Sequence, residues 1–449
     1  MRVFIIFPRG GGYNCLHSSR SWRSLRSCSL RSLVGLIAFL FACAANCVLA
    51  DAVPLSPPSD AFADGIDRTD PNFVKASLLV MSPGDELYSC AGHSCIRLEC
   101  PKFNLDYCFS YESESVKDKI FTFFMGKLKM GMFAIPTADY LKLGRESGRG
   151  VMQYTLNLPP DAKQRLWKIL DERVAQGAYL PYDYMARSCA QSALNVLTEA
   201  LAPYQLVVDT WPEKFMTWTR REFVDAAVQA YPWNKFFLYS IVGAECDRTV
   251  PKSQKAFVPR DLLAMLRQAK VAGVTLIEGD GEELLPVRHE VKSCVVTPFV
   301  VSCMAAALAA ANWFLKVKWL DWLFLAFQSL AGAFFTYLVA FSNLPATSWN
   351  WLIVPFNLLP LALWKWRAKW ALWFAGVLVL WEVGMIAYPH RLTDPAYLVL
   401  VGAYALMYAR IGWLGRACRT PLATLLRSAC FARRISATTE GRVALVATA

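Results

Sequence analysis

The sequence predicts an α+β domain that is exported from the cytoplasm, followed by an all-α domain that crosses a membrane five times. Three observations support this prediction. An arginine-rich start and an apolar run within residues 1–50 have the pattern of an export leader. Short apolar runs between turns then alternate with helical periodicity as far as residue 292. Beyond residue 293 come five apolar stretches, each close to the roughly 17–25 residues that a bilayer core requires.

The leader allows three fates. Val48-Leu49-Ala50 offers a small-residue cleavage site, which would make residues 1–50 a signal peptide. Leu40-Phe41-Ala42-Cys43 resembles a lipobox, which would place a lipid on Cys43. An uncleaved membrane anchor is the third fate, and all three carry the next domain out of the cytoplasm. Residues 51–72 are rich in Pro, Asp, Ser and Ala and are expected to form a linker.

The exported domain, residues 73–292, mixes strand and helix patterns. Apolar runs bounded by turn residues predict strands at 73–81, 94–99, 106–111 and 151–158. Residues 120–133 carry mixed signals. Helical spacing predicts helices from Pro159 to about residue 176, from Cys189 onward, over residues 211–230 and shortly after residue 256.

The membrane domain is expected to place five spans at residues 293–315, 319–341, 348–364, 370–388 and 395–414, ahead of a basic tail at 415–449. The third span is the shortest and contains Asn350, Pro355, Asn357 and Pro360. Trp and Tyr cluster at the ends of the spans, as they do at membrane interfaces.

The loops between the spans predict the orientation. Lys or Arg occurs at residues 316–318, at residues 365–369 and in the tail, whereas residues 343–347 carry neither and the fourth loop has only Arg391. Because positively charged loops stay in the cytoplasm, the first loop, the third loop and the tail are expected inside. An odd number of spans then places the preceding domain outside, in agreement with the leader.

The net charge of +12 is unevenly distributed. Residues 51–293 carry 28 basic and 31 acidic side chains, whereas residues 294–449 carry 13 basic and 4 acidic ones. The basic residues therefore flank apolar segments instead of forming a patch on the exported domain. This distribution excludes nucleic acid as a partner and indicates a protein integral to the membrane.

One stretch of the exported domain carries a candidate nucleophile. Ser188 and Gln191 form the S-x-x-Q pattern of a capping box, so a helix is expected to begin at Cys189. Apolar residues at helical spacing behind them predict that this helix buries one face. At the first helical position the helix dipole favours an anion, so the pKa of the Cys189 thiol should fall.

A nucleophilic thiol also needs a base, and the chain has four histidines: His17, His93, His289 and His390. His17 lies in the leader and His390 in a loop between expected spans. His93 follows a glycine turn at the start of an expected strand and is therefore the best candidate. The alternative is that Cys189 is one of the many buried cysteines that have no chemical role.

Seven cysteines lie in the exported part or at its edge: Cys90, Cys95, Cys100, Cys108, Cys189, Cys246 and Cys294. An oxidising compartment favours pairing, and Cys100 with Cys108, which flank a hairpin, is the candidate disulfide. An odd total leaves at least one thiol unpaired. Zinc binding by Cys90, His93, Cys95 and Cys100 is the alternative, but the spacing C-x2-H-x-C-x4-C is not a standard ligand pattern. We therefore expect no metal and no cofactor.

Charged residues at two other places are weaker candidates. Arg145 and Arg149 lie in a glycine-rich loop and either meet a phosphate or are merely solvated. Glu382 lies within the fourth expected span, where a carboxylate suggests a functional site by default. The alternative for Glu382 is that it reaches the interface or pairs with Asn350 or Asn357.

A set of motifs stands in order along the exported domain: Leu87-Tyr88-Ser89-Cys90-Ala91-Gly92-His93-Ser94, Gly144-Arg145, Leu156-Asn157-Leu158, Tyr182-Asp183-Tyr184 with Cys189, and Val242-Gly243-Ala244 through Asp247-Arg248 to Phe257-Val258-Pro259. In this order the motifs resemble the Lnb N-terminal periplasmic domain family. A tail of several spans that contains Pro345-Ala346-Thr347 also fits. The resemblance covers residues 73–265 well and the membrane part loosely.

The resemblance implies a circularly permuted papain-like (NlpC-like) fold, in which the strand with the histidine precedes the helix with the cysteine. It implies a thiol acyltransferase that N-acylates bacterial lipoproteins, held in the inner membrane with residues 51–292 in the periplasm. The catalytic roles of the family fall on Cys189 and His93. Candidates for orienting His93 or contacting substrate are Ser110, Tyr111, Tyr182, Asp183, Arg145 and Glu382.

The sequence departs from the family pattern at four places. Ser188 replaces the usual Asn before the cysteine, and Gln191-Ser192 replaces Thr-Arg after it. Leu344 replaces a His before Pro-Ala-Thr, which affects the exact reaction. Ser110-Tyr111-Glu112 replaces Asn-Tyr-Gly on the third strand, which affects the residue that orients the histidine.

The sequence hypothesis is therefore a membrane-bound acyltransferase. His93 takes the proton of Cys189, the thiolate attacks an ester of a membrane phospholipid, and a thioester passes the acyl chain to a lipoprotein N-terminus. One alternative is an NlpC-like peptidase or amidase that acts on cell-wall peptides. Another is a non-catalytic membrane protein of the cell envelope whose cysteines are structural.

Overall fold

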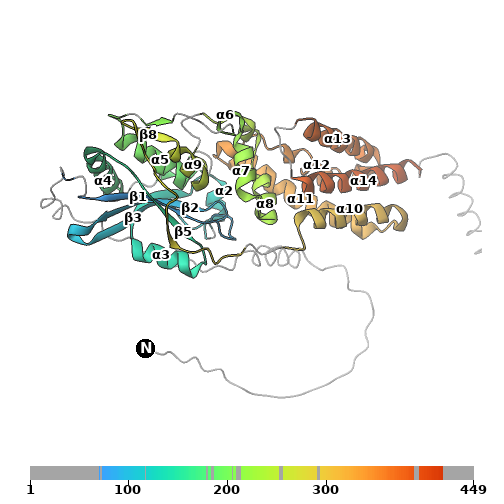
Figure 1. Cartoon of the computed structure of the whole chain (residues 1–449). Coiled ribbons are helices and arrows are strands. Elements are labelled where there is room, and N and C mark those ends of the chain that lie inside the picture. Colours follow the sequence, from blue (N-terminus) through green and yellow to red (C-terminus); the bar gives the residue numbers. More distant parts are fainter. Residues whose placement is uncertain are drawn as a thin grey trace, which may run out of the picture. The chain divides into compact units, whose positions relative to one another are not determined.

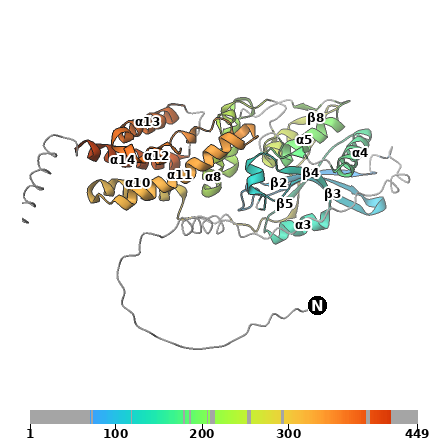
Figure 2. The same cartoon turned by 180° about the vertical axis from the view of Figure 1, so that it is seen from behind.

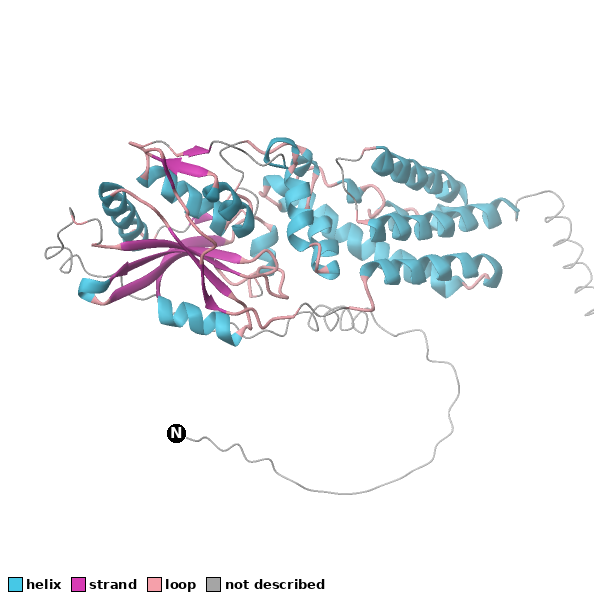
Figure 3. Cartoon of the chain, viewed as in Figure 1, coloured by secondary structure: helices cyan, strands magenta, loops and turns pink. Residues whose placement is uncertain are grey.

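The computed structural model describes residues 70, 73–116, 118–177, 180–183, 187–204, 206–208, 214–251, 256–290, 294–388 and 394–417. The expected leader with Cys43, nearly all of the linker and the tail beyond residue 417 lie outside the described residues. We call residues 73–290 the sheet domain and residues 294–417 the helical domain. The strands of the described residues all lie in the sheet domain (Figure 3).

A seven-stranded antiparallel sheet organises the sheet domain, in the order β10-β5-β1-β2-β3-β4-β6. Its strands are β1 (Lys75–Met81), β2 (His93–Cys100), β3 (Leu105–Ser113), β4 (Lys129–Pro136), β5 (Val151–Thr155), β6 (Leu180–Pro181) and β10 (Glu282–Leu285). A smaller sheet contains β7 (Val207–Val208), β8 (Ala269–Val271) and β9 (Val274–Thr275). The four predicted strands correspond to β1, β2, β3 and β5.

Helices cover both faces of the large sheet (Figures 1 and 2). On one face lie α4 (Pro160–Ala175), α5 (Cys189–Ala200) and α9 (Pro259–Arg267), packed on inward residues such as Leu78. The opposite face is covered by α3 (Thr137–Glu146), whose Tyr140 packs on Leu79. Successive strand residues point to opposite faces, which is why neighbours in β1 belong to different cores. The remaining helices of this domain are α2 (Ile120–Phe124), α6 (Lys214–Thr217), α7 (Arg220–Val228) and α8 (Pro232–Ile241).

The helical domain contains four helices that are long and apolar enough to cross a membrane within the described residues. They are α10 (Pro298–Leu315), α11 (Lys318–Phe341), α13 (Arg367–Ala387) and α14 (Pro395–Ala417). They correspond to the first, second, fourth and fifth predicted spans. The chain is therefore a membrane protein of α+β type, with its sheet ahead of its apolar helices.

The predicted third span, residues 348–364, is not a continuous helix. Three short 3₁₀ turns (Pro345–Thr347, Trp351–Ile353 and Trp364–Trp366) and a four-residue helix, α12 (Leu359–Ala362), replace it. Pro355 and Pro360 have no N–H to donate to a helix. The side chains of Asn350 and Asn357 accept the N–H groups of Leu352 and Leu359 at 3.0 Å, which favours turns over a helix. The prediction of five spanning helices is thus corrected to four in the part of the chain that the structure describes.

This irregular segment runs beside α11, which helps to satisfy its backbone. Gln328 donates to the carbonyl of Pro355 at 2.7 Å and accepts from the hydroxyl of Tyr408. At the start of the segment, the Asn343 N–H donates to Met125 of the sheet domain at 3.0 Å. At its end, the ring of Trp364 lies 5.2 Å from that of Trp322, in the first turns of α11. Irregular backbone at membrane depth requires such burial within protein.

The two ends of this segment are expected on opposite sides of the membrane, because residues 343–347 carry no positive charge and residues 365–369 carry three. We expect a reporter that is active only outside to give a signal when fused after Thr347 and none when fused after Lys369. A reporter that is active only in the cytoplasm should give the reverse pattern. The same signal from both fusion sites would contradict the crossing.

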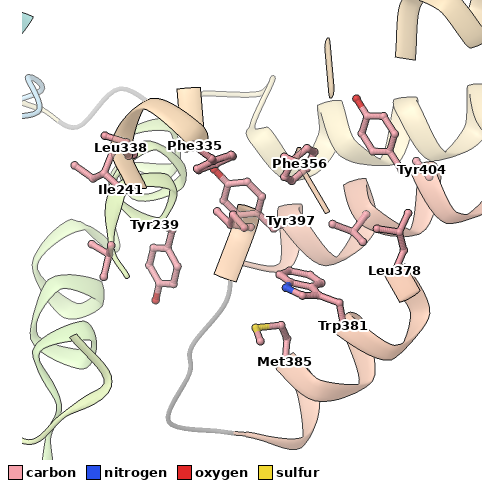
Figure 4. Packing of buried hydrophobic residues seen from close by; sticks show 14 of the residues in the cluster. Tyr239, Ile241, Phe335, Leu338, Phe356, Leu378, Trp381, Met385, Tyr397 and Tyr404 are labelled. Carbon is pink, nitrogen blue, oxygen red and sulfur yellow. The ribbon is translucent and has the colours of Figure 1, made fainter. Parts of the chain in front are cut away.

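The two domains meet through backbone hydrogen bonds between two of the motifs that the sequence singled out. The N–H of Gly243 donates to Ala346 at 2.6 Å, and that of Ala244 donates to Ser348 at 3.0 Å. Asn350 also donates to the carbonyl of Ser240 at 2.6 Å. One buried cluster continues across the junction, with contributions from α8, from α11, from the irregular segment and from α14: Tyr239, Ile241, Phe335, Leu338, Phe356, Tyr397 and Tyr404 (Figure 4).

Gly243→Ala is expected to destabilise this junction. A Cβ at residue 243 would collide with the carbonyl oxygen of Ser348, so one backbone must move away from the other. Overpacking of this kind costs about 1–3 kcal/mol, which should lower the unfolding temperature of the protein in detergent and expose the junction to protease. Gly376→Ala is the control, because a Cβ there meets nothing within 4 Å. Equal melting of the two variants would show that the junction does not contribute to stability.

The structure does not form the candidate disulfide between Cys100 and Cys108, and both thiols are free. In the β2–β3 pairing, Cys100 lies opposite Leu105 and Cys108 lies opposite Arg97. The two cysteines are therefore offset by three residues, about 10 Å along the strands, and point to opposite faces. A disulfide needs Cα atoms within about 7 Å. The sequence places the cysteines on either side of a turn, but the register separates them.

Candidate active site

Cys189 is the first residue of α5, as the sequence predicts. The side chain of Ser188 accepts the N–H of Gln191 at 3.1 Å, and Ser188 is the N-cap residue. The side-chain amide of Gln191 donates to Asn195 one turn further on. The first turn of a helix leaves its backbone N–H groups unpaired, so Cys189 lies where an anion is stabilised.

His93 is the first residue of β2 and pairs with Met81 of β1. The turn before it requires glycine, since Gly92 has a φ of +85° and a Cβ there would lie 2.9 Å from the carbonyl oxygen of Met81. The side chain of His93 is 19% exposed. This turn places His93 at the end of the sheet, beside the start of α5.

Two side chains of β3 orient the imidazole. His93 Nε2 lies 2.7 Å from Ser110 Oγ and 3.1 Å from Glu112 Oε1. Ser110 donates its own proton to Glu112 Oε1 at 2.7 Å, so its oxygen accepts from the imidazole. Because Nε2 is engaged with β3, Nδ1 is the nitrogen left for the thiol of Cys189, whose pKa is lowered by His93.

Glu112 was missed as a site residue by sequence reasoning. The β2–β3 pairing matches Ile96 with Phe109, and continuing this register three residues places Glu112 opposite His93. Residues two apart on a strand share a face, so Ser110 and Glu112 contact the same ring. The sequence does show that Ser110 and Glu112, two residues apart on an expected strand, share one face. It does not show which residue of β2 they lie opposite, because that depends on the pairing register.

The charges of the site stabilise the protonated imidazole. Burial alone lowers the pKa of His93, but the negative charges of Glu112 and Cys189, with their hydrogen bonds, raise that pKa well above its usual value. The reverse holds for the carboxylate. Burial raises the pKa of Glu112, but the positive charge of His93 and the hydrogen bonds from His93 and Ser110 bring it below its usual value.

The thiol of Cys189 responds in the opposite direction to His93. Burial raises the pKa of Cys189, but the charge and hydrogen bond of His93 lower it, and so does the backbone N–H of Ser94. The net effect is a pKa below the usual value. The arrangement therefore favours a thiolate paired with an imidazolium, the reactive form of a catalytic cysteine.

Other cysteines of the sheet domain show the contrary behaviour. Burial raises the pKa values of Cys90 and Cys246 to about 12, and burial is also the largest reason why the pKa of Cys95 lies well above its usual value. The thiol of Cys90 donates to the carbonyl of Leu87 at 3.0 Å. Thiols in such surroundings stay protonated and unreactive.

Tyr182 lies between the site and the helical domain. Burial raises the pKa of its hydroxyl, and the charge of Cys189 raises it further. The ring of Tyr182 lies 6.3 Å from that of Phe123, and the neighbouring Phe124 lies 5.2 Å from Phe334 of α11. Aromatic contacts thus connect the candidate nucleophile to an apolar helix. Asp183, the next residue, is buried.

Three of the remaining candidates lie elsewhere. The hydroxyl of Tyr111 is bonded to Arg173 of α4 at 3.1 Å, on the face of the sheet opposite to Ser110 and Glu112. The side chain of Arg145 is exposed at the end of α3. Glu382 lies on α13 against Gly402 of α14. The amides of Asn350 and Asn357, its suggested partners, instead donate to backbone carbonyls.

Arg149, which the sequence grouped with Arg145, is buried. Its Nε donates to the carbonyl of Ser82 at 2.7 Å, and its positive charge interacts with the negative charges of Cys189 and Glu112.

The described residues contain no group of three or more His, Cys, Asp or Glu side chains that could hold a metal ion. Cys90 and Cys95 also point to different partners, Leu87 and Cys108.

Residues 61–220 match the family model of the Lnb N-terminal periplasmic domain. Over residues 61–220 the match confirms the resemblance that the sequence motifs indicated, and it spans every residue of the cluster formed by Cys189, His93, Ser110 and Glu112. With the four apolar helices, it identifies a membrane protein that has a periplasmic part. Comparison with curated proteins and comparison with solved structures gave no match.

Proposed function

We propose that the chain is a membrane-bound thiol acyltransferase that takes an acyl chain from a phospholipid and transfers it to the N-terminus of lipoproteins. The observation that carries this proposal is the pairing of Cys189 with His93. The pair lies at a helix start, is oriented by Ser110 and Glu112, and belongs to a domain that packs on apolar helices.

The first half-reaction forms a thioester. The thiolate of Cys189 attacks the ester carbonyl of the lipid, and N–H groups at the start of α5 stabilise the negative oxygen of the tetrahedral intermediate. As this intermediate collapses, the bond to the glycerol oxygen breaks. The imidazolium of His93 gives its proton to that oxygen, which leaves as the hydroxyl of a lysophospholipid.

The second half-reaction forms an amide. His93 is now neutral and accepts a proton from the attacking amine of the lipoprotein N-terminus. The amine attacks the thioester carbonyl, the C–S bond breaks, and the thiolate of Cys189 is regenerated beside a protonated His93. No redox step occurs, and no cofactor enters either half-reaction.

The neighbourhood of the site supports a lipid substrate over a soluble peptide. Tyr182 contacts Phe123, and Phe124 contacts Phe334 of α11, so the nucleophile lies a few aromatic contacts away from the helical domain. An ester carbonyl sits at the boundary between the headgroup and the acyl chains of a bilayer. An NlpC-like peptidase that acts on cell-wall peptides would not need its nucleophile close to membrane-spanning helices. We place the protein in the bacterial inner membrane, with the sheet domain in the periplasm.

The experiment that tests this proposal is mass spectrometry of lipoprotein N-terminal peptides from a strain that lacks the protein. We expect the amide-linked acyl chain to be missing and to return when the wild-type gene is restored. Unchanged N-acylation would contradict the proposal. A change confined to cell-wall peptides would instead favour the peptidase or amidase alternative.

A further inference from the structure

We propose that Arg149 binds the phosphodiester of the acyl donor and so selects a glycerophospholipid over a neutral lipid ester. This inference rests on the proposed function and assigns a specificity role to a residue of the same site. Arg149 lies in the turn between α3 and β5, two residues before Val151. Val151, Met81 and His93 are paired in register across β5, β1 and β2, so Arg149 lies beyond the end of the sheet where His93 begins.

The guanidinium of Arg149 is held in place but has a free donor. Arg149 is only 9% exposed, and its Nε is fixed on the carbonyl of Ser82. Among the described residues its Nη2 is buried and has no hydrogen-bond partner. The nearby Gly84 leaves room for the side chain, since a Cβ there would lie 3.2 Å from Arg149 Cδ. A buried cationic donor without a partner is costly unless something negative binds to it.

The charged groups around Arg149 indicate which kind of ligand it can bind. It lies within electrostatic reach of Cys189 and Glu112, yet the described residues give it no ion pair with a carboxylate. The imidazolium of His93 lies beside both Glu112 and Cys189 and supplies one positive charge against their two negative charges. The charges of Cys189, Glu112, His93 and Arg149 sum to zero, so what Arg149 offers a ligand is its unpartnered Nη2, on a planar group that suits the oxygens of a phosphate.

The position of this charge favours a phosphodiester over the reacting oxygen. The oxyanion of the tetrahedral intermediate forms on the carbonyl carbon bound to Cys189, next to the N–H groups of α5. Arg149 is bound to the carbonyl of Ser82, the residue after β1, and makes no direct hydrogen bond to Cys189. In a glycerophospholipid the glycerol backbone separates the ester carbonyl from the phosphate. A lipid whose ester faces Cys189 can therefore place its phosphate at Arg149.

The test compares two donors with the same acyl chains, a phosphatidylglycerol and a diacylglycerol, in detergent micelles of the full-length protein. The rate measured is acylation of Cys189. We expect wild-type protein to prefer the phospholipid, and Arg149→Gln to lower the ratio of the phospholipid rate to the diacylglycerol rate by about 10- to 100-fold. Arg149→Lys should retain part of the preference, because it keeps the charge without the planar fork.

The matched comparison is Arg145→Gln, which removes the same charge four residues away from an exposed side chain. It should keep the full preference for the phospholipid. A second readout needs no turnover: an ether-linked phospholipid should slow alkylation of Cys189 in wild-type protein and not in Arg149→Gln.

Equal losses with both donors, or no loss with either, would overturn the role of Arg149. An Arg149→Gln protein that the ether lipid still protects would overturn it as well. If wild-type protein is acylated by neither donor, the proposed function itself fails, which is a different outcome from the selective failure of Arg149.

Discussion

Cys189→Ala is expected to abolish acyl transfer without unfolding the protein. The structure gives this thiol a lowered pKa through His93 and Ser94, and no other group of the cluster can form the thioester. Only one sulfur atom of a partly exposed residue is removed, so the buried face of α5 stays intact. Cys189→Ser should be nearly as inactive, because a hydroxyl stays protonated where a thiol ionises. The measurement is complementation of lipoprotein N-acylation, read by mass spectrometry.

Two further variants sharpen this prediction. His93→Ala should reduce the rate by at least about 100-fold, because it removes both the base and the positive charge that stabilises the thiolate. Cys95→Ala is the control and should keep activity, since its thiol is buried against Cys108 and Tyr140 on the α3 side of the sheet. Normal acylation by the Cys189→Ala protein would show that the nucleophile is another residue, with Cys90 or Cys95 as the next to test.

Glu112→Gln is expected to narrow the pH range in which the protein is active. The charge of Glu112 raises the pKa of His93, so its removal lowers that pKa and the imidazolium is lost at a lower pH. An imidazole that is less readily protonated stabilises the thiolate less, so the pKa of Cys189 rises. The thiolate–imidazolium pair exists between these two pKa values. Both limits should therefore move inward, each by about one pH unit.

The measurement for Glu112→Gln is the rate of Cys189 alkylation and of acyl transfer across the pH range. The alkaline limit of acyl transfer should fall and the acid limit of alkylation should rise. Glu114→Gln is the matched control, because Glu114 lies two residues further on and pairs with Lys119 at 2.7 Å instead of with His93. A Glu112→Gln profile that coincides with that of Glu114→Gln would show that Glu112 does not control the ionisation of His93.

Local sequence signals are sufficient for the two central residues. The S-x-x-Q pattern predicts where α5 begins, and Gly92 predicts the turn that precedes β2, so Cys189 and His93 can be placed at the starts of these elements without knowledge of the distance between them. Both features depend on neighbours within a few residues. The four long apolar helices are equally predictable, because their length and composition are local properties.

Features that depend on pairing between distant segments cannot be predicted in this way. The roles of Ser110 and Glu112 require the register of β3 against β2, and the same register separates Cys100 from Cys108. Arg145 and Arg149 look alike in sequence, and only the fold exposes the first and buries the second.

The broken third span shows the same limit. Its composition is apolar enough for a membrane-spanning helix. Its two prolines and two asparagines, however, prevent a continuous helix from forming. The resulting backbone is accepted because Gln328 of α11 binds it and Asn350 anchors it to the sheet domain. Such compensation comes from side chains that are distant in sequence, so it cannot be predicted from the local sequence of the segment.

The most direct measurement is a search for the acyl-enzyme. Full-length protein is incubated with a phospholipid and no amine acceptor, and the peptide that contains Cys189 is analysed by mass spectrometry. The expected result is a mass increase of one acyl chain on Cys189 that neutral hydroxylamine removes, with no such adduct in the Cys189→Ala and His93→Ala proteins. A Cys189 peptide that remains unmodified, or an adduct on another residue that persists in the Cys189→Ala protein, would contradict thiol acyl transfer at this site.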